Sequence, residues 1–348
     1  MPTISIDTFF ACTIMIAVVI GATVLSSEIL SAHTAEYQNL NEDDYLRALS
    51  ENIILNGGAP AGWGSNESMI PEVFGLAKNG SLNPTQLDID KISRLNGQNA
   101  FALTYTQLLK AARLKNIALG ISVTQLLDVS ITPYSNNTSG NSTTYVFEVS
   151  VSEDNAPVTA SLNCYVVAKN FVFSTTGSTS LDGVCYMNIE IPNASNGTAS
   201  LIVFARATCD SRITAYAVYC FEQAFTDQPP TNNLLKLSPL DNNLWISPNY
   251  SEIVLENAYA FSYDYESNLT VTSNSTYAIP SFLDESPIVL ILTGTSASTF
   301  FIEWTAYPQI PLDAGADFTK AECHSFSYVV DVRGALYSLE LRFGGSSQ

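Results

Sequence analysis

The chain has 348 residues and a net charge of −19, with 33 acidic against 14 basic side chains. This excess of acid argues against binding to nucleic acid or to a surface of anionic lipid, because both need a basic footprint. With 46% hydrophobic residues the chain can fill sizeable cores, and its length predicts about two to three domains beyond the N-terminal segment.

The N-terminal segment is the longest apolar stretch of the chain. Residues 8–27 carry no charged side chain, and as a helix they would span about 30 Å, the thickness of the hydrocarbon core of a bilayer. We therefore expect a transmembrane anchor at residues 1–27, with residues 8–27 in contact with membrane lipid. Three interpretations stay open: a cleaved secretory signal, a plain signal anchor, and the helix of an assembling subunit.

A short motif precedes the apolar run. Ser5 and Asp7 place a hydroxyl and an acid two residues apart, and Phe9 and Phe10 begin the apolar run. The pattern resembles the N-terminus of archaeal type IV pilin-like proteins, which have Gln where this chain has Thr3 and a basic leader that this chain lacks. The resemblance implies self-assembly through bundled apolar helices, with the acid buried beside the N-terminus of a neighbouring subunit.

The orientation of the anchor is predicted by sequons rather than by flanking charge. No Lys or Arg flanks the apolar run, so the positive-inside rule does not apply. Ten Asn-x-Ser/Thr sequons follow it and indicate a glycosylated, extracellular location for the C-terminal bulk of a single-pass cell-membrane protein. The candidate glycosylation sites are Asn66, Asn79, Asn136, Asn137, Asn141, Asn193, Asn196, Asn249, Asn268 and Asn274.

Residues 28–116 predict a helical stalk and a membrane-proximal module. Residues 28–55 contain neither Pro nor Gly and favour a helix, which the following Asn-Gly-Gly should end. Two short amphipathic helices are predicted at residues 87–95 and 105–114.

Part of this module has a recognisable pattern. The strings Leu-Asn-Gly-Gly-Ala-Pro-Ala-Gly-Trp-Gly at residues 55–64 and Pro-Glu-Val-Phe-Gly-Leu-Ala at residues 71–77 resemble a module that follows pilin-like helices in uncharacterised archaeal surface proteins. The resemblance implies no activity. The alternative is that Trp63, Phe74 and the glycines only shape turns and fill the core.

From residue 117 the hydrophobic period changes to two, which is typical of β-strands. Strands are predicted at residues 117–131, 144–152, 158–168, 184–191, 199–207 and 213–221, with a polar tip at residues 135–143. They predict an antiparallel β-sandwich at residues 117–226. The string Ala-Pro-Val-Thr-Ala-Ser-Leu-Asn-Cys at residues 156–164 is similar to Ig-type, prealbumin-like surface modules, which space, adhere or present.

Residues 227–233 (Asp-Gln-Pro-Pro-Thr-Asn-Asn) predict a linker to a second β domain at residues 227–348. Its strands are predicted at residues 251–258, 269–272, 288–293, 299–306, 325–332 and 335–343. Residues 332–335 should form a hairpin turn, and the last strand is placed to pair with residues 117–131. The expected fold class is α+β: a long N-terminal transmembrane helix, a small helical module and two mainly antiparallel β-sandwich-like domains.

Six cysteines occur in the chain. Cys12 lies in the apolar segment and is interpreted as a small apolar residue. Five remain outside it, an odd number, so at least one thiol, for instance that of Cys323, stays free or pairs between chains. The disulfide candidates are Cys164, Cys185, Cys209 and Cys220.

No sequence motif for catalysis is present. His33 and His324 are the only imidazoles, and neither Gly-x-Ser-x-Gly nor Cys-x-x-Cys occurs. Two acid pairs could bind calcium, but without an Asp-x-Asp-x-Asp-Gly loop we expect solvated acids there. These pairs are Asp88 with Asp90 and Asp313 with Asp317. We expect no catalytic residue, no cofactor and no bound metal.

The expected function is that of a membrane-anchored extracellular structural or adhesive protein, which self-assembles or contacts other surface proteins. The alternative is a membrane-tethered, non-catalytic module that binds an extracellular sugar or protein. Trp245, Trp304 and tyrosines gathered in an exposed groove would favour this alternative, and burial of all three tryptophans would weaken it. A hydrolase ranks third and requires convergent buried carboxylates.

Overall fold

The computed structural model describes residue 15 and residues 43–223, 234–249, 252–273, 275–280, 285–318 and 323–345. The chain divides into two compact units, Met1–Glu51 and Asn52–Gln348. Several predicted features lie outside the described residues: the apolar run except residue 15, the motif Ser5, Asp7, Phe9 and Phe10, Cys12, His33, the linker 227–233 and Asn274. No helix in the described part of the chain is long and apolar enough to cross a membrane.

The described part of the predicted stalk is a helix at residues 43–55. Its last backbone bond runs from the Asn56 N–H to the Asn52 carbonyl, 3.0 Å away. The chain then turns at Gly58, where φ is +74°. A Cβ at Gly58 would lie 2.6 Å from the Val73 carbonyl oxygen, so only glycine fits this close approach. The predicted end of the helix is confirmed.

Two short helices follow. Helix α2, Ile89–Ser93, is capped by the Asp88 side chain, which accepts from two backbone N–H groups of the first turn. Helix α3, Tyr105–Ala111, begins with a capping box between Thr104 and Gln107. Both predicted helices are confirmed, each shorter than its apolar pattern.

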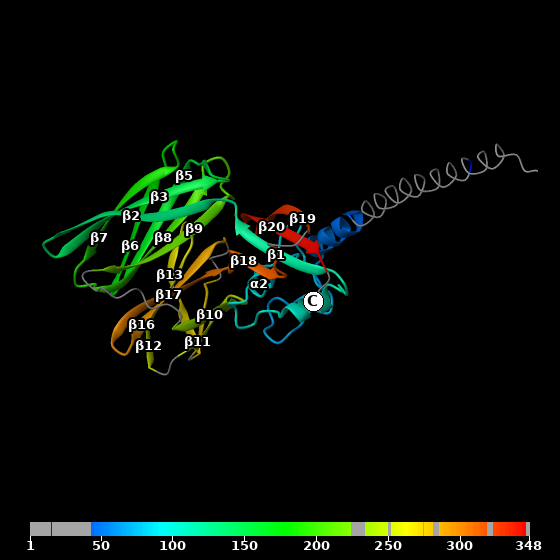
Figure 1. Ribbon diagram of the computed structural model, residues 1–348. Helices are drawn as coiled ribbons and strands as arrows, with labels where there is room; N and C mark the ends of the chain where they lie inside the picture. The colour runs from blue at the N-terminus through cyan, green and yellow to red at the C-terminus, as the bar shows by residue number, and fades with distance from the viewer. Residues whose placement is uncertain are drawn as a thin grey trace, which may run out of the picture. The chain divides into compact units, whose positions relative to one another are not determined.

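Most of the remaining described chain is antiparallel β-sheet, which confirms the predicted mainly antiparallel character of the β regions. One sheet contains β2, β3, β4 and β7, with β3 paired to the other three. The second sheet, which we call the central sheet, has the order β6-β5-β8-β9 (Figure 1). The bounds are β2 Asp128–Ser139, β3 Ser142–Glu153, β4 Ala156–Pro157, β5 Ala160–Ala168, β6 Phe171–Ser178, β7 Val184–Pro192, β8 Gly197–Ala207 and β9 Thr214–Gln223.

These two sheets share one apolar core. Val149 and Met187 from the first sheet and Leu162 and Val203 from the central sheet all belong to it. The packing is that of a β-sandwich. Two details differ from the sequence prediction. The predicted polar tip belongs to a hairpin, in which β2 and β3 continue to a turn at Gly140. The segment between the strands predicted at residues 158–168 and 184–191 is not a loop but contains β6. As an edge strand, β6 needs apolar residues on one face only.

A second pair of sheets is built from the C-terminal region. Their orders are β10-β11-β15-β14 and β13-β12-β16-β17. The bounds are β10 Leu235–Leu240, β11 Asn243–Pro248, β12 Ile253–Phe261, β13 Glu266–Asn268, β14 Thr270–Ser273, β15 Thr276–Ala278, β16 Ile288–Ser296 and β17 Thr299–Tyr307. The second of them packs Phe261 and Ile291 against Tyr165 and Phe204 of the central sheet. The central sheet is therefore covered on both faces, and for this reason nearly every residue of β8 is buried.

The last sheet joins residues from both ends of the β region. Its order is β18-β1-β20-β19, with bounds β1 Ala118–Gln125, β18 Leu312–Gly315, β19 His324–Val332 and β20 Ala335–Gly344. Strand β1 pairs with β20 over its whole length, so the predicted pairing is confirmed, and Arg333 and Gly334 form the predicted hairpin turn. The single strand predicted at residues 117–131 is wrong, since β1 ends at Gln125 and β2 enters a different sheet.

Candidate functional site

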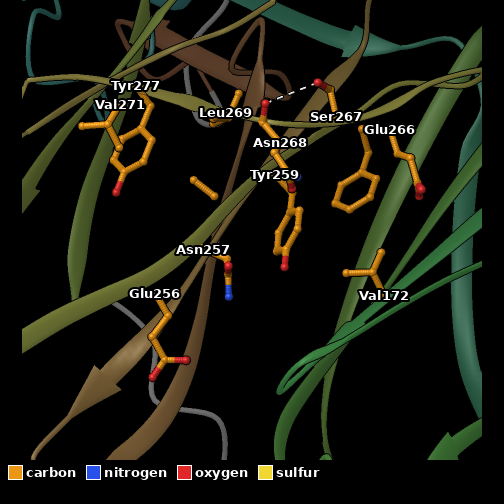
Figure 2. Close-up of a pocket in the computed structure, with 12 residues that line it drawn as sticks. Val172, Glu256, Asn257, Tyr259, Glu266, Ser267, Asn268, Leu269, Val271 and Tyr277 are labelled. Atoms are coloured by element: carbon orange, nitrogen blue, oxygen red, sulfur yellow. Dashed lines mark hydrogen bonds between the residues drawn. The ribbon is translucent and has the colours of Figure 1, made fainter.

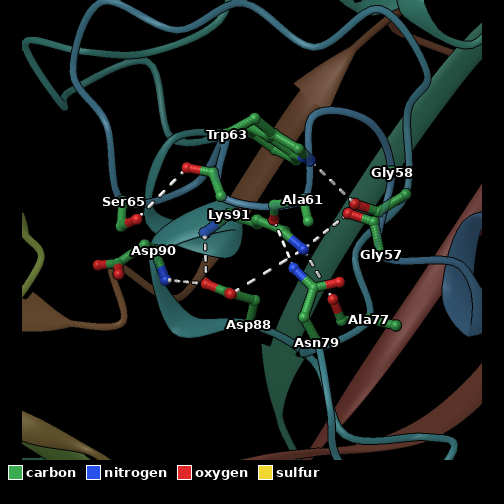
Figure 3. Close-up of polar contacts among 12 residues, drawn as sticks. Gly57, Gly58, Ala61, Trp63, Ser65, Ala77, Asn79, Asp88, Asp90 and Lys91 are labelled. Carbon is green, nitrogen blue, oxygen red and sulfur yellow. Dashed lines mark hydrogen bonds and ion pairs between the residues drawn. The ribbon is translucent and has the colours of Figure 1, made fainter.

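Helix α2 carries three charged side chains into the interior. Lys91 has no exposed surface, and Asp90 and Arg94 are also buried. The ammonium of Lys91 donates to the carbonyls of Gly57 and Ala77, at 2.8 and 2.7 Å, and lies 3.9 Å from an oxygen of Asp88 (Figure 3). Burial lowers the pKa of Lys91, and the Asp88 carboxylate opposes that shift. Lys91 thus joins two loop segments to the helix.

Arg94 holds the loop that follows Trp63. Its guanidinium lies 5.7 Å from the centre of the Trp63 ring and donates to four carbonyls, those of Trp63, Asn66, Met69 and Phe101. The bonds to Asn66 and Met69 are both 2.8 Å. Trp63 itself is fully buried and packs against Phe74, which confirms the interpretation of these aromatics as core. The Arg94 side chain therefore fixes the backbone of residues 63–69.

Asp90 holds a second segment, the turn between β10 and β11. One of its oxygens accepts from the Asp241 N–H at 2.8 Å and from the Tyr307 hydroxyl at 2.6 Å. Burial raises the pKa of Asp90, and the hydrogen bond from Tyr307 opposes the rise. Arg333 completes the arrangement by donating to Asn242 at 2.6 Å. The expectation that Asp90 is a solvated acid is wrong, because tertiary partners satisfy its carboxylate inside the protein.

The two segments line a groove of about 480 Å³. Its lining residues are Ser65, Asn66, Glu67, Ser68, Leu240, Asp241, Asn243 and Trp245. Trp245 is partly exposed because β11 alternates, with Leu244 and Ile246 buried on its opposite face. Phe101 contacts the indole edge-on at a centroid distance of 5.7 Å. The groove thus combines one oriented aromatic ring with a polar rim.

A second groove, of about 530 Å³, opens beside β12. Figure 2 shows Tyr259 and Tyr277 in its lining together with Asn257 and Asn268. Tyr259 pairs with Asn268 across β12 and β13, which places both side chains on one face. Burial raises the pKa of Tyr259 and of Tyr277. A glycan on Asn268 would therefore stand inside this groove.

The three tryptophans do not gather in one place. Trp63 is core, Trp245 lines the first groove, and Trp304 on β17 is 38% exposed. Trp304 packs edge-on against Tyr216 at 6.3 Å and lines neither groove. The condition set for a binding module, a groove that gathers Trp245, Trp304 and tyrosines, is thus not met, although Trp245 by itself lines a groove. The opposite condition, burial of all three tryptophans, is not met either.

The described sequon asparagines lie at the surface. Eight of the nine are exposed and Asn193 is half-buried. Five gather at one end of the β-sandwich, where the Asn193 N–H donates to the Asn141 carbonyl at 2.8 Å and joins the β2–β3 turn to the β7–β8 turn. These five, which we call the sequon cluster, are Asn136, Asn137, Asn141, Asn193 and Asn196.

The five described cysteines are all free thiols. Cys164 and Cys185 point into the same core. Burial raises the pKa of Cys164 to about 12, and the neighbouring Cys185 adds to the rise. Cys209 is exposed, and Cys220 and Cys323 are half-buried. Disulfide pairing stays a prediction. Cys164 and Cys185 are two of its candidates, and their side chains pack in the same core.

The second acid pair, Asp313 and Asp317, is exposed, as expected of solvated acids. Asp313 forms an ion pair with Arg342 at 2.6 Å. Over the residues that the structure describes, no three His, Cys, Asp or Glu side chains gather in a way that could hold a metal ion.

Sequence reasoning missed the buried charges of α2 and the groove. A signal for the groove was present, since Asp241-Asn242 stands between two apolar alternating runs and is a turn dipeptide. Both residues have positive φ, 51° and 53°. No local signal marks Asp90 as buried, because its partners come from the β10–β11 turn and from β17.

Comparisons with known proteins leave the family open. No family model matches the chain, and no curated protein matches it. Among solved structures, HBP35 of Porphyromonas gingivalis is similar over 53% of this chain and 64% of its own, with 13% identity and a TM-score of 0.21. Red sea bream transglutaminase is similar over 58% of this chain and 32% of its own, with 10% identity and a TM-score of 0.23. The chain thus spans less than two thirds of either protein.

Proposed function

We propose that the chain is a membrane-anchored extracellular structural or adhesive protein. The observation that carries the proposal is the position of the sequons, with eight of the nine described asparagines exposed and five gathered in the sequon cluster. An apolar N-terminal run of bilayer length supports it from the sequence. The several antiparallel sheets supply a rigid scaffold that can space and present a surface.

Assembly is the mechanism we favour. Apolar helices at residues 8–27 would bundle, as the pilin-like motif at Ser5 and Asp7 implies, while the β region faces outward. The rival is a lone tethered protein that binds an extracellular ligand. The Trp245 groove favours this second candidate, because it combines an oriented indole with exposed polar side chains.

The assembly state of the native protein separates the two candidates. We expect the full chain, sheared from its membrane, to be recovered as high-mass filaments that contain the residue 8–27 helix. The measurement is intact mass together with sedimentation and electron microscopy. A detergent-solubilised monomer with residues 1–27 intact would contradict assembly and leave the tethered binding protein.

Glycan mapping tests the extracellular location separately. We expect glycans on the exposed members of the sequon cluster, and lower occupancy at Asn79 and Asn193. The reason is that the amide nitrogens of these two side chains, which would carry the sugar, donate to the carbonyls of Ala61 and Gly140. Glycopeptide mass spectrometry of the native protein makes the measurement. Unmodified sequons throughout would contradict an N-glycosylated exterior, and equal occupancy would contradict the role of the two hydrogen bonds.

A further inference from the structure

We propose that the Trp245 groove is a binding site for a neutral saccharide. The inference deepens the adhesive function proposed above by naming the chemical class of its ligand, and it rests on that function only for the ligand being extracellular.

The indole of Trp245 provides the platform. A pyranose ring presents a face of C–H groups that packs on an aromatic ring, and the negative face of the ring attracts these weakly positive hydrogens. Phe101 contacts Trp245 at an interplanar angle of 82°, so the indole is held in one orientation while it remains partly exposed to the groove. Little ordering entropy is then lost when a sugar binds.

The polar rim matches hydroxyl groups. Glu67 and Asp241 supply carboxylates, which only accept hydrogen bonds, and neither carboxylate bonds to another described residue. The amide of Asn243 donates to the Asp241 carbonyl at 2.9 Å, which leaves its oxygen as a further acceptor. Vicinal hydroxyls of a sugar can donate to such acceptors.

The charge of the lining narrows the ligand class. Its eight residues include two carboxylates and neither Lys nor Arg. Phosphates, sulfated sugars and uronic acids would be repelled by these carboxylates. Ser65 and Ser68 donate their hydroxyl hydrogens to the Gly62 carbonyl and the Asn66 side-chain oxygen, so their oxygens remain as acceptors, while the Asn66 amide nitrogen can donate. Acceptors beside a donor and an aromatic ring suit a polyhydroxylated neutral ligand.

Both walls are held from inside the protein. Arg94 fixes the wall at residues 65–68 through the Asn66 and Met69 carbonyls, and Asp90 fixes the opposite wall through the Asp241 N–H. Arg94 and Asp90 belong to helix α2 and its C-terminal flank, so the two walls share one support. Such preorganisation is what a binding site requires.

The test uses the full chain made in a host without N-glycosylation, so that Asn66 carries no sugar that could fill the groove. The protein is kept in a detergent without a sugar headgroup and exposed to an array of neutral hexose and N-acetylhexosamine oligosaccharides. We expect binding to at least one of these, with quenching or enhancement of tryptophan fluorescence. Trp245→Ala should weaken it at least tenfold and Glu67→Gln several-fold, whereas Trp304→Ala, at the other partly exposed tryptophan, should leave it unchanged.

Three results would overturn the proposal: no neutral saccharide bound by the folded chain, binding that survives both Trp245→Ala and Glu67→Gln, or binding of tetramethylammonium or poly-lysine in place of saccharides. If circular dichroism shows that Trp245→Ala does not fold, Glu67→Gln tests the proposal instead, because Glu67 is exposed and its substitution should leave the fold intact. The experiment does not depend on anchor or filament, so its failure is distinct from failure of the proposed function.

Discussion

Replacing Arg94 by alanine is expected to lower the free energy of unfolding by about 3–5 kcal/mol, the range for breaking a buried charged network. The guanidinium donates to four carbonyls, and these would lose their donor in surroundings that give water little access. A cavity would also open beside the Trp63 ring. Urea denaturation of the full chain, followed by tryptophan fluorescence, measures the change.

Lys110→Ala is the matched control. Lys110 is an exposed cation on α3, so its removal should change stability by no more than about 0.5 kcal/mol. If Arg94→Ala were as mild as this control, Arg94 would not be the support of residues 63–69. Because Arg94 fixes one wall of the groove, its loss should also weaken saccharide binding, even where the variant remains folded.

Replacing Tyr307 by phenylalanine is expected to cost about 1.5–3 kcal/mol at pH 7, the range for a hydrogen bond to a charged group. The Tyr307 hydroxyl donates to Asp90 at 2.6 Å, and phenylalanine keeps the ring that packs near Arg333. The variant therefore removes one donor from a buried carboxylate, together with the acceptor of a longer bond, 3.4 Å, from the Asn242 N–H. Thermal and urea unfolding at several pH values measure the effect.

The cost of Tyr307→Phe should depend on pH with a definite sign. The hydrogen bond from Tyr307 lowers the pKa of Asp90 against the larger rise caused by burial, so its loss raises that pKa further in the folded variant. The variant then binds a proton at pH values where the folded wild type does not, and its deficit grows as the pH rises through this window. At low pH, with Asp90 protonated in both proteins, the deficit should be smallest.

Asp90→Asn provides the control for this prediction. The side-chain oxygen of asparagine still accepts from Asp241 and Tyr307, and no charge remains to be desolvated. In that background Tyr307→Phe should cost less and its cost should no longer change with pH. A cost that stays pH-dependent in the Asp90→Asn protein would assign the titration to another group.

Local pattern predicted much of the secondary structure. Strands such as β5, β8, β17 and β20 lie within about two residues of their alternating or apolar runs, and helix α3 lies within the stretch that its apolar spacing predicts. The short strands β10 and β11 were missed, since each contains a proline, which argues against a strand interior. Strand β6 was missed because its solvated face is rich in Ser, Thr and Gly.

The sequence by itself determined the strand-rich character of residues 117–348, the turns at Gly58 and Arg333–Gly334, and the candidate sequons, because each depends on residues within a few positions of one another. Only the tertiary structure decided which strands share a sheet and that the central sheet is covered on both faces. It also decided that Asp90 is buried, since its partner Tyr307 lies 217 residues away. Burial of a charge depends on such distant partners, and a sequence pattern cannot show where they fold.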